Sequence, residues 1–195
     1  MSLFPPESRR DDVSRNRRSP SSRLIRSVLG GGFIFFAFAI VGYATGMRVN
    51  LSGSIPPGLY RIERGPIVSG AIVLACLPPT PSKFARDRGY VPSGACDDGR
   101  APVGKTVGAV AGDTVDVTER GVAVNGRLLP NTAALSKDTE GRWLPVMRIL
   151  RHVVPPSEVW LLSTYSAHSF DSRYYGGIQA SRIVARVQPL IARTR

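Results

Sequence analysis

Lysine is scarce in this sequence, although the chain is strongly basic. Of the 26 Lys and Arg residues, only Lys83, Lys105 and Lys137 are lysines. An arginine keeps its proton under almost all protein conditions, whereas a buried lysine can lose it. Arginine is therefore excluded as a proton acceptor, and any chemistry that uses lysine as a base has three candidates.

Histidine and cysteine are equally rare, with two residues of each. Two cysteine ligands alone make a poor zinc site, and neither histidine is close in sequence to Cys76 or Cys96. We therefore predict neither a metal site nor a cofactor. In an exported domain, two cysteines that flank a loop rich in Pro, Arg and Gly favour a disulfide over free thiols.

The net charge of +12 is unevenly distributed along the 195 residues. Beyond residue 26, no stretch of the sequence interleaves clustered basic residues with aromatics, as a nucleic-acid groove would. We therefore expect no nucleic-acid partner and attribute the charge to membrane topology. Seven arginines precede the first long apolar run: Arg9, Arg10, Arg15, Arg17, Arg18, Arg23 and Arg26.

The chain is long enough for one anchor and one compact domain. Residues 1–26 are predicted to form a basic cytoplasmic tail. The uncharged run 27–47 is about as long as the ~20 residues a membrane-crossing helix needs, so it is predicted to be a transmembrane helix. A cleaved signal peptide is the alternative, but its apolar region is usually only ~7–15 residues. The positive-inside rule then places residues 48–195 outside the bacterial inner membrane, in the periplasm.

The residue pattern beyond the apolar run predicts a mainly β domain. Short apolar, β-branched runs predict strands over 71–75, 106–110, 114–117 and 159–162. Asn125-Gly126 lies between two further apolar stretches and predicts a hairpin turn. Neither an amphipathic helix of normal length nor an internal repeat is evident.

Ser54 is the first residue singled out by its surroundings. It lies shortly after the predicted anchor, in Ser-Ile-Pro-Pro-Gly-Leu-Tyr. Prolines and glycine make such a turn rigid, so the hydroxyl can be presented without competing for a strand ladder. A plain linker between anchor and domain remains an alternative interpretation.

Lys105 is a single cation in the otherwise uncharged run Pro102–Ala111, which ends in Gly112-Asp113. Desolvation disfavours the charged ammonium and lowers the pKa of a lysine, which makes the neutral amine available as a base. Lys83 and Lys137 lie in polar loops. A surface lysine at a strand start is the alternative for Lys105.

A third segment runs from His168 to Ile178 and brings acid, hydroxyl and base into one loop. Such a loop could orient a catalytic lysine through a serine hydroxyl, with Asp171 and Arg173 paired as a structural clamp.

The three segments together resemble the S26 signal-peptidase clan, and more closely its conjugative-transfer branch, the TraF-type peptidases. The resemblance runs from about Asn50 to Leu190. It rests on Ser54-x-Pro-x-Gly-Leu-Tyr60, on Lys105 followed by Gly112-Asp113, and on Phe170-Asp-Ser-Arg-Tyr-Tyr-Gly176. The loop between the two cysteines is similar to that branch as well.

The resemblance implies a signal-peptidase-like catalytic domain of coiled β-sheets over residues 48–195. Ser54 is then the nucleophile and Lys105 the general base, with Asp171 a further functional residue. The Ser54 backbone N–H, with the Ser52 hydroxyl, is expected to form the oxyanion hole, and Ser169 to place the lysine. Ile55 and Thr106 depart from general signal peptidases, which usually have methionine and a basic residue there.

The implied function is that of a membrane-anchored serine endopeptidase with a Ser/Lys dyad. Its expected substrate is a conjugative pilin precursor, which it cleaves or cyclises through an acyl-enzyme. Components of a conjugation or type IV secretion apparatus are further expected partners. Three alternatives remain: a general type I signal peptidase, a non-catalytic membrane subunit, and a Ser/His/Asp triad of Ser54, His168 and Asp171.

Overall fold

The computed structural model describes residues 21–193. The chain divides into two compact units, residues 1–41 and 42–195. Because the description begins at residue 21, the basic tail predicted over residues 1–26 lies mostly outside the described residues.

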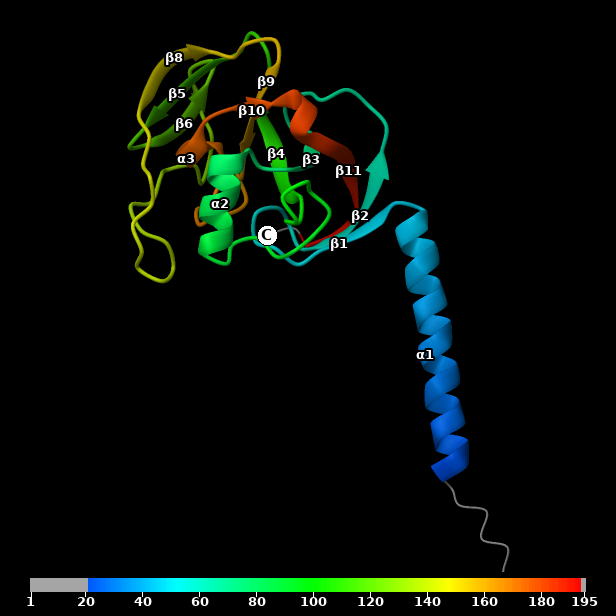
Figure 1. Ribbon diagram of the computed structural model, residues 1–195. Coiled ribbons are helices and arrows are strands. Elements are labelled where there is room, and N and C mark those ends of the chain that lie inside the picture. Colours follow the sequence, from blue (N-terminus) through cyan, green and yellow to red (C-terminus); the bar gives the residue numbers. More distant parts are fainter. Residues whose placement is uncertain (1–20, 194–195) are drawn as a thin grey trace, which may run out of the picture. The chain divides into compact units, whose positions relative to one another are not determined.

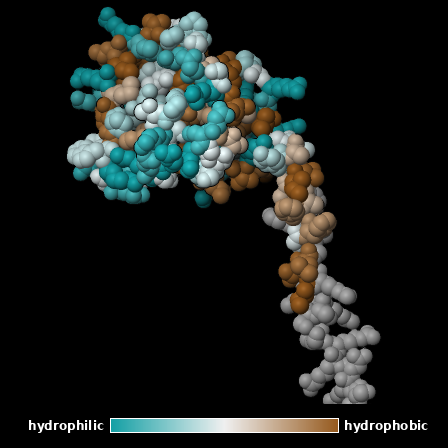
Figure 2. All heavy atoms as spheres, in the orientation of Figure 1, coloured by the Kyte–Doolittle hydropathy of each residue, from teal (hydrophilic) through white to brown (hydrophobic). Residues whose placement is uncertain are grey.

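Helix α1 (Ser21–Ala44) overlaps the predicted transmembrane segment without matching its bounds. It ends before residue 47 because Gly46 adopts a positive φ of 84° and Met47 already belongs to a strand. The helix carries exposed apolar side chains such as Val28, Phe33 and Phe36, and Figure 2 shows apolar residues on the coloured part of the helix. In the part of the chain that the structure describes, no helix is both long and apolar enough to cross a membrane. The transmembrane helix predicted over residues 27–47 is therefore not found.

The second unit is built on two antiparallel sheets (Figure 1). The larger sheet has the strand order β1, β2, β11, β3, β4, β9, β10, and the smaller has the order β7, β6, β5, β8. The prediction of a mainly β domain is confirmed. The strands of the larger sheet are β1 (Met47–Asn50), β2 (Gly58–Glu63), β3 (Ile72–Ala75), β4 (Val103–Ala109), β9 (Glu158–Leu162), β10 (Ile178–Gln179) and β11 (Ile183–Ala192).

The smaller sheet contains the predicted hairpin turn. Asn125 and Gly126 both adopt positive φ values, 51° and 79°, as a tight two-residue hairpin requires. The strands expected over 71–75, 106–110, 114–117 and 159–162 are likewise present with small differences in their bounds. The smaller sheet consists of β5 (Thr114–Thr118), β6 (Gly121–Val124), β7 (Arg127–Leu128) and β8 (Ile149–Val153).

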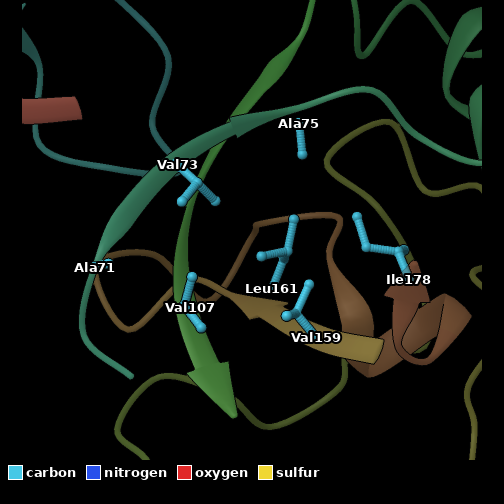
Figure 3. Close-up of a cluster of buried hydrophobic side chains, with 7 residues drawn as sticks. All are labelled: Ala71, Val73, Ala75, Val107, Val159, Leu161 and Ile178. Carbon is cyan, nitrogen blue, oxygen red and sulfur yellow. The ribbon is translucent and has the colours of Figure 1, made fainter. Parts of the chain in front are cut away.

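Strand β9 is buried on both faces and joins two apolar cores. Val159 and Leu161 belong to the core that Figure 3 shows between β3, β4 and β9, together with Val73 and Val107. Successive strand side chains point to opposite faces, and Trp160 belongs to a second core with residues of β5 and β6. This double burial fixes the start of the loop that follows β9.

One helix was missed from the sequence. Helix α2 (Pro79–Asp87) lies in the loop between Cys76 and Cys96 and begins in a proline-rich stretch that indicates a turn. Proline is tolerated in the first helical turn because its missing N–H has no partner there. The remaining helices are the short α3 (Ser172–Tyr175) and the 3₁₀ turn η1 (Ala180–Arg182).

The predicted disulfide is confirmed, because Cys76 and Cys96 are bonded to each other. Within the loop that it closes, the Ser82 hydroxyl of α2 donates a hydrogen bond to Asp98, just beyond Cys96. The disulfide and this hydrogen bond hold α2 against the far end of the loop.

Candidate active site

Ser54 lies in the tight loop between β1 and β2, and the side chain of Asn50 organises this loop. The Asn50 amide nitrogen donates to the carbonyl oxygens of Ser52, Ile55 and Pro56 at 3.1, 3.1 and 3.2 Å. Ile55 is buried, whereas Ser54 remains partly accessible. One side chain thus holds three carbonyls of the turn and keeps the Ser54 hydroxyl at its surface.

The Ser52 hydroxyl is also tied to Asn50. It donates to the Asn50 side-chain oxygen at 2.7 Å, while the Ser52 backbone N–H donates to the same atom at 3.2 Å. Ser52 is exposed. To serve an oxyanion hole, as the sequence resemblance implies, its hydroxyl must first leave this partner.

The structure brings Lys105 and Ser169 against Ser54. The Lys105 ammonium nitrogen Nζ lies 2.7 Å from Ser54 Oγ and 2.6 Å from Ser169 Oγ. Lys105 pairs with Val73 across β3 and β4 and is 3% exposed. Ser54, Lys105 and Ser169 therefore meet, although they come from a loop, a strand and the segment after β9.

Burial lowers the pKa of Lys105 to about 8, because the charged ammonium is removed from water. The charge of Asp171 opposes this effect and raises the pKa, while that of Arg173 lowers it. At pH 7 about one tenth of the Lys105 side chains are therefore neutral amines, the form that accepts a proton, and this fraction rises with pH.

The other two lysines lie in different surroundings. Lys83 forms an exposed ion pair with Asp87 on α2, and Lys137 lies 4.6 Å from the centre of the Trp143 ring on the surface. Both side chains are exposed, as polar surroundings predict, although Lys83 lies on helix α2 and not in a loop. Between residues 21 and 193, Lys105 is the lysine that touches a serine hydroxyl.

Asp171 and Arg173 form the predicted clamp. Arg173 Nε donates to Asp171 Oδ1 at 2.8 Å and Nη2 donates to Oδ2 at 2.9 Å, and both side chains are fully buried. The remaining guanidinium hydrogens are directed to backbone carbonyls, so the pair is satisfied without water. These carbonyls belong to Asn131, Ala133, Ala167 and Ser163.

Asp171 does not touch Ser54 or Lys105 through any hydrogen bond between the described residues. Its carboxylate accepts instead from the backbone N–H of Ser163 and of Arg173. Its influence on Lys105 is therefore electrostatic, and its influence on Ser54 must pass through other groups.

His168 is exposed at the end of the same loop. Its backbone N–H donates to the Ser166 hydroxyl, and no hydrogen bond of its ring is found within residues 21–193. The imidazole does not bridge Ser54 and Asp171 as a Ser/His/Asp triad requires. The position beside the Ser54 hydroxyl is filled by Lys105.

A cleft of about 1050 Å³ opens beside these residues. Ser54, Lys105 and Ser169 lie in its wall. Much of the remaining wall is apolar or aromatic, with Leu74, Tyr90 and Phe170 among the residues on different segments. Such a lining suits apolar groups of a ligand.

Two contacts of the Ser54 loop were missed from the sequence. Neither Asn50 nor Ser163 was assigned a role from the sequence. The Ser163 hydroxyl donates to the Ser54 backbone carbonyl at 2.6 Å. A serine that contacts a main-chain atom 109 residues away leaves no local signal in the sequence.

The chain belongs to the signal peptidase, peptidase S26, family, whose profile matches residues 23–191. It is 41% identical over 176 residues to "Plasmid transfer protein TraF" of Escherichia coli, covering 87% of this chain and 98% of that protein. It is 35% identical to "Conjugal transfer protein TraF" of Agrobacterium tumefaciens (strain 15955), covering 86% of this chain and 95% of the relative. A crystal structure of a signal peptidase I from Enterococcus faecalis V583 is 18% identical, with a TM-score of 0.36, over 65% of this chain and 99% of that chain.

Proposed function

We propose that this chain is a serine endopeptidase in which Ser54 is the nucleophile and Lys105 the general base. The observation that carries the proposal is the 2.7 Å contact between Lys105 Nζ and Ser54 Oγ at a buried site where the pKa of the lysine falls to about 8. A nucleophile and a base within hydrogen-bond reach, with the base oriented by a third group, are the signature of covalent catalysis. Ser169 is that third group, at 2.6 Å from Nζ.

The first half of the reaction forms an acyl-enzyme. Ser54 Oγ bonds to the scissile carbonyl carbon while the neutral Lys105 Nζ takes the hydroxyl proton. The carbon–nitrogen bond then breaks, and Nζ returns that proton to the leaving amine. The Ser54 backbone N–H stabilises the oxyanion, and the Ser52 hydroxyl joins it after rotating away from Asn50.

The second half depends on which nucleophile reaches the ester. If water attacks, Nζ takes its proton and passes it to Ser54 Oγ, and the product is a linear chain with a new carboxylate. If an amine of the substrate attacks, Nζ takes its proton and passes it to Ser54 Oγ, the ester bond breaks as a new peptide bond forms, and the product is cyclic. The two products differ in mass by one water.

The proposed substrate is a conjugative pilin precursor. This step rests on the relatives, which are called plasmid or conjugal transfer proteins and are covered almost over their full length. Components of a conjugation or type IV secretion apparatus are the proposed further partners. The apolar lining of the cleft beside Ser54 supports a substrate that presents apolar groups there.

We place the catalytic unit at the periplasmic face of the bacterial inner membrane, attached through the segment 27–47. The arginines before this segment and the exposed apolar side chains of α1 support the proposal. Fractionation at alkaline pH tests attachment, and protease added to spheroplasts tests the orientation. Release of the full-length chain with the soluble fraction would contradict attachment.

Co-expression with the pilin precursor of the same conjugation system tests the activity. The intact mass of the pilin is compared for wild type, Ser54→Ala, Lys105→Ala and Lys105→Arg, with Lys83→Arg as the matched control. Lys105→Arg keeps the positive charge but removes a base that can release its proton. We expect processing by wild type and Lys83→Arg only, with each inactive variant accumulating normally.

The outcomes separate the parts of the proposal. Normal processing by Lys105→Arg would show that Lys105 is not the base. An unchanged pilin with wild type would reject the substrate and favour a general signal peptidase or a non-catalytic subunit, which a panel of exported precursors tells apart.

A further inference from the structure

We infer that Ser163 is a positioning residue, which holds the main chain of Ser54 in the geometry that acylation needs. The inference rests on the proposed serine-peptidase function and assigns to it a residue outside the three sequence segments. Ser163 lies directly after β9, is fully buried, and does not touch Lys105 through any hydrogen bond between the described residues.

Every polar atom of Ser163 has a partner. Its hydroxyl donates to the Ser54 carbonyl at 2.6 Å and accepts from the Ser166 N–H at 3.0 Å. Its own N–H donates to Asp171 Oδ2 at 2.9 Å, and its carbonyl accepts from Arg173 Nη2 at 3.0 Å. The residue is therefore fixed on the main-chain side by the buried ion pair and on the side-chain side by the Ser54 loop.

These contacts make a continuous connection from the ion pair to the proposed nucleophile. Asp171 and Arg173 hold the backbone of Ser163, and its hydroxyl holds the carbonyl of Ser54. The hydrogen bonds to the Ser163 N–H and carbonyl are strengthened because their partners, Asp171 and Arg173, are charged. Because β9 is buried on both faces, Ser163 cannot shift without disturbing two cores.

Ser163 binds a carbonyl of the Ser54 loop that Asn50 does not bind. The Asn50 amide binds the carbonyls of Ser52, Ile55 and Pro56, but the carbonyl of Ser54 itself is bound by Ser163. Fixing that carbonyl fixes the peptide plane after Ser54 and limits the rotation of the residue that carries Oγ. A small displacement of Oγ matters, because a misplacement of about 1 Å can reduce a rate by about 100-fold.

The matched control is Ser172, which is also fully buried and contacts strand β9. Its hydroxyl accepts from the Leu161 N–H at 2.9 Å and makes no hydrogen bond to Ser54 among residues 21–193. Ser163→Ala and Ser172→Ala each remove one buried hydroxyl that binds a backbone group. They differ in whether that backbone group belongs to Ser54.

The test measures kcat, KM, the pH dependence of kcat and thermal unfolding on the purified full-length protein, with the pilin precursor as substrate. We expect Ser163→Ala to lower kcat by about 10-fold to 100-fold, with KM changed by less than about 2-fold. The midpoint of the pH profile should stay near the wild-type value, because Ser163 does not bind the base. Ser172→Ala should keep kcat within about 3-fold.

Equal kcat values for Ser163→Ala and wild type would overturn the inference, as would equal losses in both variants that follow their loss of stability. If Ser163→Ala does not fold, Ser163→Cys is used, since its thiol has a similar size and is a weak donor. The kcat of Ser163→Cys is then expected to lie between those of wild type and Ser54→Ala. A kcat equal to that of wild type would again overturn the inference. Failure of the proposed function is distinct: there, wild type itself matches Ser54→Ala.

Discussion

Asp171 and Arg173 are joined by two hydrogen bonds, at 2.8 and 2.9 Å, and neither side chain is exposed to solvent. A buried ion pair of this kind adds little stability by itself, because both charges have lost their water. Its loss is nevertheless costly, since the remaining charge is left without a counter-charge. The pair thus makes the geometry around Ser163 and Lys105 depend on both partners at once.

Replacing one partner tests this dependence. Asp171→Asn leaves the Arg173 guanidinium charged and buried, and we expect the free energy of unfolding to fall by about 3 kcal/mol or more. Chemical denaturation measures the loss. Asp87→Asn, which removes an exposed pair with Lys83, should change the stability little. Equal losses of unfolding free energy in Asp171→Asn and Asp87→Asn would contradict the claim that burial makes the Asp171–Arg173 pair costly to break.

Asp171→Asn should also move the pH profile of catalysis. The Asp171 charge raises the pKa of Lys105, so its removal should shift the midpoint below that of wild type. The pH dependence of kcat/KM separates this effect from a loss of stability, which lowers the active fraction without moving the midpoint. An unchanged midpoint would show that the Asp171 charge does not raise the pKa of Lys105.

The wild-type rate should rise with pH as Lys105 loses its proton. With a pKa of about 8, the neutral fraction increases about tenfold per pH unit well below this value and levels off above it. We therefore expect kcat/KM, which reports ionisations of the free enzyme, to follow one ionisation with its midpoint near pH 8, in buffers of constant ionic strength. A rate independent of pH between 6 and 9 would contradict a lysine base at this pKa.

The same ionisation makes folding stability depend on pH. The pKa of Lys105 is lower in the folded chain than the ordinary value of 10.5, so the unfolded chain binds more protons between about pH 8 and 10.5. Stability from this group therefore rises with pH across that window and is lowest below pH 8. Lys105→Met should remove this rise, which amounts to about 3 kcal/mol. Denaturation of both proteins at pH 7 and pH 10 measures the difference.

The sequence allowed much of the fold and part of the site to be predicted. Alternating and β-branched runs indicated the strands, and Asn125-Gly126 indicated its turn, because these patterns depend on near neighbours. Ser54, Lys105 and Ser169 were found together only through family resemblance. Ser163 and helix α2 were missed, since one acts through a distant main-chain carbonyl and the other begins among prolines that indicate a turn.

His168 offers a direct contrast with Lys105. Its side chain is exposed, and its ring makes no hydrogen bond to Ser54 or Asp171 in the described part of the chain. We expect His168→Ala to keep kcat within about 3-fold of wild type, whereas removal of a triad histidine costs several orders of magnitude. The intact mass of the pilin after a timed incubation measures this. Loss of processing in a folded His168→Ala variant would favour the histidine mechanism.

The disulfide should stabilise the domain by restricting the unfolded chain. Cys76 and Cys96 are 20 residues apart, and closing a loop of this length contributes about 3 kcal/mol. We expect reductant to lower the unfolding midpoint of wild type to that of the double variant Cys76→Ala/Cys96→Ala, which itself should not respond to reductant. If wild type with both thiols shown to be free unfolds at the oxidised midpoint, the disulfide has no such effect.

Gly58 allows β11 to approach β2 beside the Ser54 loop. A Cβ atom at this position would lie 2.1 Å from the Ile191 carbonyl oxygen and 2.7 Å from Ala192 Cα, and both are backbone atoms that cannot rotate away. Gly58→Ala should therefore displace the end of β11 and lower the free energy of unfolding by about 2–3 kcal/mol.

Gly53→Ala is the control for Gly58→Ala, because a Cβ there would meet nothing within 4 Å and its φ is not in the left-handed region. Its stability should change by less than about 0.5 kcal/mol. Thermal and chemical unfolding of the two variants test the difference, and equal stabilities would contradict the close strand approach. Arg193 N–H donates to the Pro57 carbonyl at 3.0 Å, so displacement of β11 by Gly58→Ala should also disturb the loop that carries Ser54 and reduce processing.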